Sequence, residues 1–359
     1  CCSEPPCCAA SHVKIAPSAC KGYYTSYTRR VGHRLELAQA LMHEKMIVLV
    51  AAAGLAHSAS GFATFASRIQ QLQESMITQA KTADPTATWT VDAHSRGKAC
   101  ILEDGKVWEK GCISVTLIED GELSAVRAAT ISGRTGTTIS EGARYSACAL
   151  SFVLHAHSPL VPTLRGDARV FVVGDDEWYG GGLDLTPSYV EPDDCAHFHA
   201  SLSELCGTHG EASTYAEMKA CCDQYFYLPC RKEHRGVGGI FFDDLSAAWA
   251  PALCEQMLAC ALDPEGPYLP IVRKRQPLEY TEAQKQWQLL RRGRYIEFNL
   301  LYDRGVKFGL SPEAVERVLV SSPPLVAFKY KTSAEQPAGS PEAETLEVLR
   351  NPRDWLAAD

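Results

Sequence analysis

The chain has 359 residues, of which 46% are hydrophobic and 22% are charged, and these values are typical of globular proteins. They exclude a disordered or fibrous protein. The formal net charge of −8 argues against nucleic acid as a partner, because neutralising phosphates requires a basic surface. An anionic ligand would therefore need a local basic pocket.

Residues 1–65 have the features of a leader that targets the chain. Lys45 precedes a short apolar run, 46–56, and small residues follow at 58–61. A basic flank, a short apolar centre and a small-residue cleavage region are typical of signal peptides. The run is shorter than the roughly 20 residues that span a bilayer, and a buried core helix is the alternative interpretation. We expect a poorly ordered or processed leader, followed by one domain over residues 66–359 without an integral membrane segment.

Phe62 lies directly after these small residues. An aromatic residue at this point is similar to the bipartite leaders that direct proteins to plastids of secondary origin. We therefore expect a plastid (chloroplast) location, with the mitochondrion as the alternative.

Hydrophobic periodicity and helix-start signals predict secondary structure along the rest of the chain. The predicted helices cover residues 65–81, 193–206, 215–225 and 247–262. The predicted strands cover residues 113–119, 168–173, 239–242 and 295–303. In the last of these, polar and apolar residues alternate from Tyr295 to Asp303, which is typical of a strand with one polar face. Because helices and strands interleave without a regular βαβ repeat, we expect an α+β layer fold.

The run at 178–187, Trp-Tyr-Gly-Gly-Gly-Leu-Asp-Leu-Thr-Pro, places three glycines beside one carboxylate, that of Asp184. Gly180, Gly181 and Gly182 can adopt backbone angles closed to other residues, and they let a flat ligand approach the main chain. Asp184 on such a floor could accept hydrogen bonds from ligand N–H groups or take a proton. The alternative is a glycine-rich turn capped by Asp184.

The same run is similar to the W-[WF]-[FY]-G-G-G-x-D-L-T-P signature of oxygen-dependent coproporphyrinogen III oxidases. Two more blocks agree with that family, RGVGGIFFDDL at 235–245 and RRGRYIEFNLLYDRGVKFGL at 291–310. Shorter matches are LEDGKVWEKG at 102–111 and LEVLRNPRDWL at 346–356. The blocks occur in the family's order and spacing.

This resemblance implies a large, flat antiparallel β-sheet between layers of α-helices, in a homodimer. It also implies the conversion of coproporphyrinogen III to protoporphyrinogen IX in haem and chlorophyll biosynthesis, in which two propionates become vinyl groups. Molecular oxygen is the co-substrate, and no metal or organic cofactor is required. The protein then mainly holds an easily oxidised tetrapyrrole and controls its protonation.

The resemblance also assigns roles to individual residues. Asp184 matches an aspartate under the pyrrole N–H groups, and Arg169 matches an arginine that anchors the substrate beside it, so these two form the expected catalytic pair. The expected substrate-binding residues are Ser151, Arg165, Asp167, Arg169, Arg231, Arg235, Gly180, Gly181 and Gly182. A guanidinium suits a propionate because its planar fork binds a carboxylate through two hydrogen bonds. For each arginine, a structural ion pair is the alternative.

Several positions depart from the family pattern. The histidine often assigned as proton donor is Arg165 here, and the family asparagine is Asp167. An arginine, with a pKa above about 12, cannot shuttle protons near neutrality, so Arg165 can neutralise a propionate but cannot replace imidazole. The family's T-G-G-R loop corresponds to Ser-Pro-Glu-Ala at 311–314, which lacks the carboxylate-binding arginine. The alternative to an active enzyme is therefore a catalytically weak paralogue that binds a tetrapyrrole or serves as a dimer subunit.

We expect no metal site. Four histidines bind metal in some family members according to one proposal, and the matching residues here are His155, Arg165, His199 and Cys230. The cysteines from Cys100 to Cys260 form no C-x-x-C pair, which favours free thiols.

Overall fold

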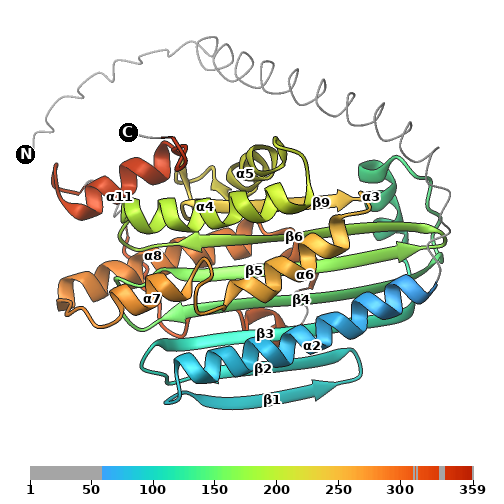
Figure 1. Ribbon diagram of the computed structural model, residues 1–359, viewed down its shortest axis with the longest axis horizontal. Coiled ribbons are helices and arrows are strands. Elements are labelled where there is room, and N and C mark those ends of the chain that lie inside the picture. Colours follow the sequence, from blue (N-terminus) through green and yellow to red (C-terminus); the bar gives the residue numbers. More distant parts are fainter. Residues whose placement is uncertain (1–58, 310–311, 313, 331–335, 358–359) are drawn as a thin grey trace, which may run out of the picture. The chain divides into compact units, whose positions relative to one another are not determined.

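An antiparallel sheet of seven strands lies at the centre of the computed structural model, which describes residues 59–309, 312, 314–330 and 336–357 (Figure 1). Its strands are β1 (Thr88–His94), β2 (Gly97–Glu103), β3 (Trp108–Glu122), β4 (Arg144–Ala156), β5 (Thr163–Val173), β6 (Asp176–Thr186) and β9 (Gly238–Leu245). They pair in chain order, and every neighbouring pair is antiparallel. A separate short hairpin joins β7 (Tyr227–Leu228) to β8 (Glu233–His234).

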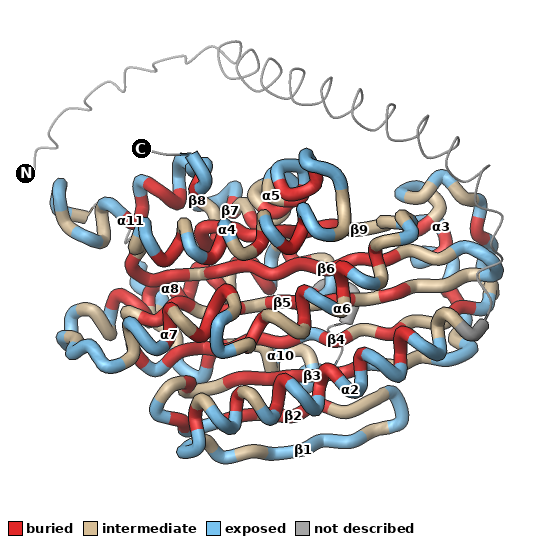
Figure 2. The backbone as a smooth tube through the Cα atoms, in the orientation of Figure 1, coloured by how far each residue is buried: buried red, intermediate tan, exposed pale blue. Residues whose placement is uncertain are grey.

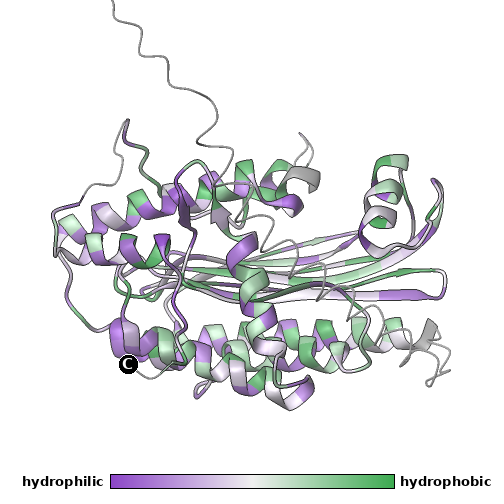
Figure 3. Ribbon diagram, turned by 90° about the horizontal axis from the view of Figure 1, so that it is seen from above, coloured by the Kyte–Doolittle hydropathy of each residue, from purple (hydrophilic) through white to green (hydrophobic). Residues whose placement is uncertain are grey.

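Helices lie on both sides of the sheet, as its edge-on view shows (Figure 3). The first layer contains α2 (Ala59–Ala83), α4 (Pro192–His209), α6 (Ala250–Ala261) and α7 (Leu269–Arg275). The opposite side carries α3 (Ala125–Thr135), α8 (Glu282–Leu301), α9 (Arg304–Gly309) and α10 (Val315–Leu319). The remaining described helices are α5 (Thr214–Tyr225), which packs along β9, and α11 (Pro341–Arg350). None of the helices in this part of the chain has the length and hydropathy required to cross a bilayer.

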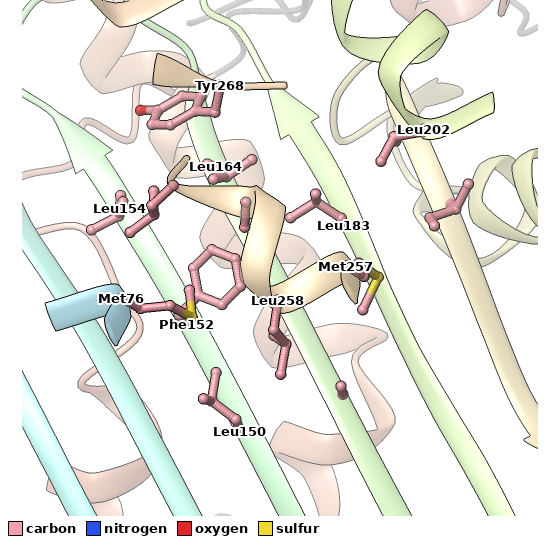
Figure 4. Packing of buried hydrophobic residues seen from close by; sticks show 14 of the residues in the cluster. Met76, Leu150, Phe152, Leu154, Leu164, Leu183, Leu202, Met257, Leu258 and Tyr268 are labelled. Carbon is pink, nitrogen blue, oxygen red and sulfur yellow. The ribbon is translucent and has the colours of Figure 1, made fainter. Parts of the chain in front are cut away.

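The main hydrophobic core lies between the sheet and the first helix layer (Figures 2 and 4). Met76 of α2 and Leu258 of α6 pack there against Phe152 and Leu150 of β4. Successive strand residues point to opposite faces, so the apolar half of each central strand covers this core. The remaining side chains of each strand point to the opposite face of the sheet.

In the part of the chain that the structure describes, small hydrophobic cores lie near the two ends of that opposite face. Around α3, a small core gathers Leu123, Ile131 and Tyr145, and near α8 a second one contains Phe241 and Phe298. Between them the central strands carry small or polar residues, which are listed in register below. Ser151, in the middle of β4, is exposed although its strand is central to the sheet. Among the described residues, the middle of this face thus keeps side chains accessible to solvent, and we refer to it as the floor.

Most of the predicted elements are confirmed. The predicted helices lie in α2, α4, α5 and α6, and three predicted strands lie in β3, β5 and β9, within an α+β fold built on an antiparallel sheet. The predicted leader lies outside the described residues except for 59–65, which form the first turns of α2. The glycine run is not a turn, because residues 178–186 belong to strand β6, between β5 and β9.

The predicted strand at 295–303 is wrong, because residues 282–301 form the helix α8. Polar residues of α8 are buried in ion pairs, as Arg291 is with Glu233 and Arg292 with Glu109. Polarity therefore does not mark a solvent-exposed face here, and the alternation that resembled a strand carried no information about exposure. A capping box between Thr281 and Gln284 marks the start of the helix instead.

Candidate active site

Strand register brings several of the predicted site residues to one face of the sheet. Arg165 lies opposite Asp184, Asp167 opposite Gly182, and Arg169 opposite Gly180 in the β5–β6 pair. In the β4–β5 pair, Ser151 lies opposite Asp167. Since alternate residues of a strand share a face, Arg165, Asp167 and Arg169 all belong to the floor. Asp184 and Ser151 join them from the neighbouring strands.

Asp184 forms a buried ion pair with Arg235. The Nη2 atom of Arg235 lies 2.5 Å from Oδ2 of Asp184, and the two side chains are 0% and 6% exposed. The guanidinium of Arg235 sits among the rings of Phe226, Tyr295 and Phe298, with centroids 3.9, 4.9 and 5.0 Å from its Cζ. A charge buried this deeply is tolerated only with such a partner. Arg235 therefore fixes the position of the Asp184 carboxylate at the end of the floor nearest α8.

Polar atoms without partners surround this pair. Among the described residues, Nε and Nη1 of Arg235, the Tyr295 hydroxyl and Oδ1 of Asn299 are buried and have no hydrogen-bond partner. Unsatisfied buried polar groups are rare in folded proteins and need an explanation such as a ligand, a water or a catalytic role. Arg235 lies on the β8–β9 connection beside Asp184, Tyr295 of α8 packs on Arg235, and Asn299 lies one turn further along α8.

Arg165 is held by a different carboxylate. Its Nη1 atom lies 3.1 Å from Oδ2 of Asp303, a residue that directly precedes α9. Burial raises the pKa of Asp303, but the Arg165 guanidinium, the backbone N–H of Val306 and Arg235 together more than offset this, and the net pKa is below its usual value. Asp184 and Asp167 also contribute to raising the pKa of Arg165 against the effect of its burial. Arg165 therefore stays a cation at the end of the floor nearest α8.

Arg169 lies across the glycine strand. It forms ion pairs with Asp167 and with Asp243, whose Oδ1 atom is 3.0 Å from its Nη2. A Cβ atom added to Gly180 would lie 2.7 Å from Cζ of Arg169, so this glycine makes room for the arginine. Arg165 and Asp167, the two residues that depart from the family pattern, thus place opposite charges on the same face of the sheet. The negative one, Asp167, is paired with Arg169.

The glycine run does not use unusual backbone angles, and this part of the prediction is wrong. In the described residues, left-handed glycines occur on the partner strand, at Gly238 with a φ of 83° and Gly239 with a φ of 158°. Gly181 and Gly182 serve close strand packing, since their added Cβ atoms would each lie 2.6 Å from a carbonyl oxygen of a neighbouring strand. The glycines thus set the spacing of the central strands.

Arg231 does not contact Asp184. It is exposed and lies 2.5 Å from the Glu297 carboxylate on α8, so it forms an ion pair, and its role in substrate binding stays a prediction. Of the shortened loop, Ser311 and Glu313 lie outside the described residues. Ala314 immediately precedes α10.

The two histidines at the proposed metal positions make structural hydrogen bonds. Nε2 of His155 lies 2.9 Å from the carbonyl oxygen of Ser321, and Nδ1 of His199 lies 2.8 Å from the Tyr215 hydroxyl. Burial lowers the pKa of each imidazole to about 3. In the part of the chain that the structure describes, no three His, Cys, Asp or Glu side chains are grouped so as to hold a metal ion. His155 belongs to β4 of the sheet and His199 to α4 of the first helix layer.

The cysteines of the described residues are free, as predicted. Most are buried, and only Cys221 and Cys230 are exposed. Burial raises the pKa of Cys112 and that of Cys148 to about 12. These thiols are therefore protonated at neutral pH.

Comparison with known proteins places the chain in a family. A family profile described as coproporphyrinogen III oxidase matches residues 64–355. The chain belongs to the coproporphyrinogen III oxidase family. This family assignment covers the whole sheet, the floor and the helices on both sides of it.

Similar proteins come from animals and bacteria. The oxygen-dependent coproporphyrinogen-III oxidase, mitochondrial, of Mus musculus is 40% identical over 302 residues, covering 80% of this chain and 67% of the mouse protein. The oxygen-dependent coproporphyrinogen-III oxidase of Francisella philomiragia is 36% identical over 312 residues, covering 82% of this chain and 97% of the bacterial protein. The match spans 62% to 67% of the length of the mouse, human and rat relatives.

Sequence reasoning missed three residues that complete this site. Asp243 pairs with Arg169, Asp303 pairs with Arg165, and Tyr295 packs its ring against Arg235. All three lie in the blocks that resemble the coproporphyrinogen III oxidase family, which was the available signal. Their roles did not follow from the sequence because they depend on contacts between β9, α8 and the floor.

The buried histidines predict a loss of stability in acid. A histidine whose pKa falls from about 6.5 in the unfolded chain to about 3 in the folded protein binds its proton more weakly when folded, so stability decreases as pH drops below about 6.5. We expect His155→Gln to reduce the loss in unfolding free energy between pH 6.5 and 4.5 by about 2 kcal/mol. Urea unfolding at the two pH values measures this difference. Equal losses in the variant and the wild type would contradict the assignment of a neutral, buried His155.

Proposed function

We propose that this chain is an oxygen-dependent coproporphyrinogen III oxidase, which forms protoporphyrinogen IX in haem biosynthesis and uses molecular oxygen as its co-substrate. The observation that carries this proposal is the buried carboxylate of Asp184 on the floor, with Arg165 opposite it in β5 and Arg169 on the same face of β5, opposite Gly180. A carboxylate suits the pyrrole N–H groups of a tetrapyrrole, and guanidinium groups suit its propionates. The named activity of the relatives supports the same reaction.

The chemistry leaves little for the protein to do beyond binding and charge control. Each propionate gives a vinyl group, carbon dioxide and a proton, and two electrons pass to oxygen. In the proposed complex, Asp184 accepts hydrogen bonds from pyrrole N–H groups, while Arg235 keeps its carboxylate in place. Arg165 and Arg169 bind propionates and so orient the ring on the floor. We propose no metal or organic cofactor for this reaction.

The test is turnover by the full chain. Reduced coproporphyrinogen III is mixed aerobically with the purified protein, and the divinyl product is measured by fluorescence after oxidation to the porphyrin. Product that the wild type forms and that the Asp184→Asn variant does not form at a comparable rate supports oxidase activity. No product, together with tight binding of coproporphyrin, would instead identify a tetrapyrrole-binding paralogue whose chemistry was lost.

Arg165→His restores the residue that the family pattern has at this position. We expect this change to raise KM several-fold, because the shorter imidazole replaces a permanent cation that binds a propionate. Steady-state kinetics at pH 6 and pH 8 measure the effect, which should be larger at pH 8, where imidazole is mostly neutral. Unchanged kinetics at both pH values would place Arg165 outside the substrate contacts.

Gly180→Ala tests the path of Arg169 across the glycine strand. The new methyl group would occupy space within 2.7 Å of Cζ of Arg169, so the guanidinium must move while the strand need not. We expect KM to increase about tenfold with a change in unfolding free energy below about 1 kcal/mol.

Gly182→Ala is the matched control for this change. Its methyl group would lie 2.6 Å from the backbone oxygen of Ile240, which cannot move aside like a side chain, so it should destabilise the fold by about 1–3 kcal/mol. A Gly180→Ala variant with unchanged KM would show that the position of Arg169 does not matter for substrate binding.

We also propose a homodimer in a plastid, where it would serve chlorophyll as well as haem biosynthesis, with the mitochondrion as the alternative location. The family resemblance supports the dimer, and the basic flank, apolar run and small residues at 45–61 support an organellar leader. Light scattering of the purified protein tests the first proposal. Imaging of residues 1–65 fused to a fluorescent protein tests the second.

A further inference from the structure

A cavity of about 480 Å³ lies in the first helix layer, on the side of the sheet away from the floor. Its walls come from the C-terminal half of α2, from the segment that joins α6 to α7, and from α7 itself, and Figure 1 shows these helices on one face of the sheet. Pockets that bind small molecules enclose about 300–1,000 Å³. The cavity therefore has the size of a ligand site, and none of the floor residues lines it.

The inner wall of this cavity is apolar. Leu262, Leu269 and Val272 line it, and each is at most 7% exposed. Two exposed threonines, Thr78 and Thr82, lie at its mouth. Their hydroxyl groups each donate to a carbonyl oxygen one turn earlier in α2, at 2.9 Å. A ligand in the cavity would thus gain mainly from the removal of apolar surface from water.

One polar atom of the lining has no hydrogen-bond partner in the described part of the chain. Oε1 of Gln79, on α2, is buried, and no described residue donates to it. A buried acceptor without a donor costs about 1–3 kcal/mol, so such atoms are rare in folded proteins. An N–H or O–H group of a ligand would satisfy this oxygen.

The charge at the mouth is already neutralised. Arg273 carries the one formal charge among the lining residues. Its Nη2 atom lies 3.0 Å from Oε1 of Glu265 and 2.5 Å from the carbonyl oxygen of Pro264. An anionic ligand would compete with Glu265 for the same guanidinium, which is 54% exposed and screened by solvent. The cavity therefore favours a neutral ligand.

We propose that this cavity is a second binding site, separate from the floor, for a neutral and mainly apolar ring compound with one hydrogen-bond donor, such as an aromatic amine or a phenol. The rings pack on Leu262, Leu269 and Val272, and the N–H or O–H group donates to Oε1 of Gln79. Rigid rings suit the cavity because they lose less conformational freedom on binding than a flexible chain.

Three related probes separate the features of this ligand. N-phenyl-1-naphthylamine is neutral, has one N–H donor, and becomes more fluorescent in apolar surroundings. Its N-methyl derivative keeps the rings but lacks the donor, and 8-anilinonaphthalene-1-sulfonate adds an anionic group to the same rings. Each probe is titrated into the full chain with fluorescence as the readout. We expect the neutral amine to bind the wild type more tightly than either of the other two.

Gln79→Leu tests the hydrogen bond, because leucine keeps an apolar side chain at the wall but has no acceptor. We expect it to raise the Kd of the neutral amine about fivefold, which corresponds to about 1 kcal/mol, and to leave the Kd of the N-methyl derivative unchanged. Gln70→Leu is the matched control, since it makes the same change at an exposed position of α2 that does not line the cavity. It should change neither Kd.

Thr82→Trp tests the location of the probe, because an indole at the mouth occupies the entrance from an exposed position. We expect it to weaken the binding of both neutral probes at least about tenfold, and Thr78→Trp repeats this test from the second mouth position. Urea midpoints close to that of the wild type would show that a loss of binding comes from the filled cavity and not from a damaged fold.

Three results would overturn the proposal. Unchanged or tighter binding of the neutral amine to Gln79→Leu would show a purely apolar contact without the hydrogen bond. Unchanged binding to both tryptophan variants would place the probe outside the cavity. Tighter binding of the sulfonate than of the neutral amine to the wild type would contradict the preference for a neutral ligand.

Discussion

Asp184→Asn is expected to lower kcat by about 10²- to 10³-fold, the range found when one preorganised electrostatic contact is removed from an active site. Asparagine keeps the size of the side chain and an oxygen that can face Arg235, but it loses the negative charge that suits the pyrrole N–H groups. Single-turnover measurements with coproporphyrinogen III separate this effect on chemistry from any effect on binding.

Asp167→Asn provides the matched control for this prediction. It makes the same chemical change on the same face, two positions along β5 from Arg169, with which Asp167 forms an ion pair. Asparagine is also the residue of the family pattern at this position, so we expect less than a tenfold change in kcat. If Asp184→Asn retained wild-type turnover, the central role of this carboxylate would be lost, and Arg235 would be a purely structural partner.

Arg235→Met is expected to lower the free energy of unfolding by about 3–5 kcal/mol. The guanidinium is fully buried, and its removal leaves the Asp184 carboxylate without its partner in an apolar surrounding of aromatic rings. Breaking a buried ion pair from one side costs more than the pair itself contributes, because an uncompensated charge remains. Urea unfolding at pH 7 measures this loss.

A double variant separates stability from chemistry at the same site. Asp184→Leu combined with Arg235→Met removes both charges, and we expect most of the lost stability to return. Turnover should not return, since no carboxylate remains on the floor. Near wild-type stability of Arg235→Met alone would show that water or another group compensates Asp184.

The fold was largely predictable because its signals are local. The β-branched and aromatic residues at 168–173 pack against cores on both faces of β5, and the periodicity of 65–81 follows from α2 covering the main core. The failure at 295–303 has the opposite cause. There, Arg291, Arg292 and Arg294 are buried on a helix, so polar residues no longer mark the surface.

The residues of the site could be predicted from the sequence, but the contacts between them could be predicted less well. The position of Asp184, Arg165 and Arg169 on one face agrees with the roles that the resemblance implies, although those roles stay predictions. The sequence could not show that Asp184 is paired with Arg235, or that Gly180 makes room for an arginine. Such contacts join residues more than 10 positions apart through the β5–β6–β9 register, which no local pattern encodes.

The buried cysteines have a consequence for a protein proposed to handle oxygen and a readily oxidised substrate. Oxidation to sulfenic acid proceeds through the thiolate, and thiols such as Cys112 and Cys148, with pKa values raised to about 12, contain almost none at pH 7. Hydrogen peroxide or other reactive oxygen species released near the floor would therefore react only slowly with these interior thiols. Oxidative damage to thiols in the described residues should be confined to the surface, at Cys221 and Cys230.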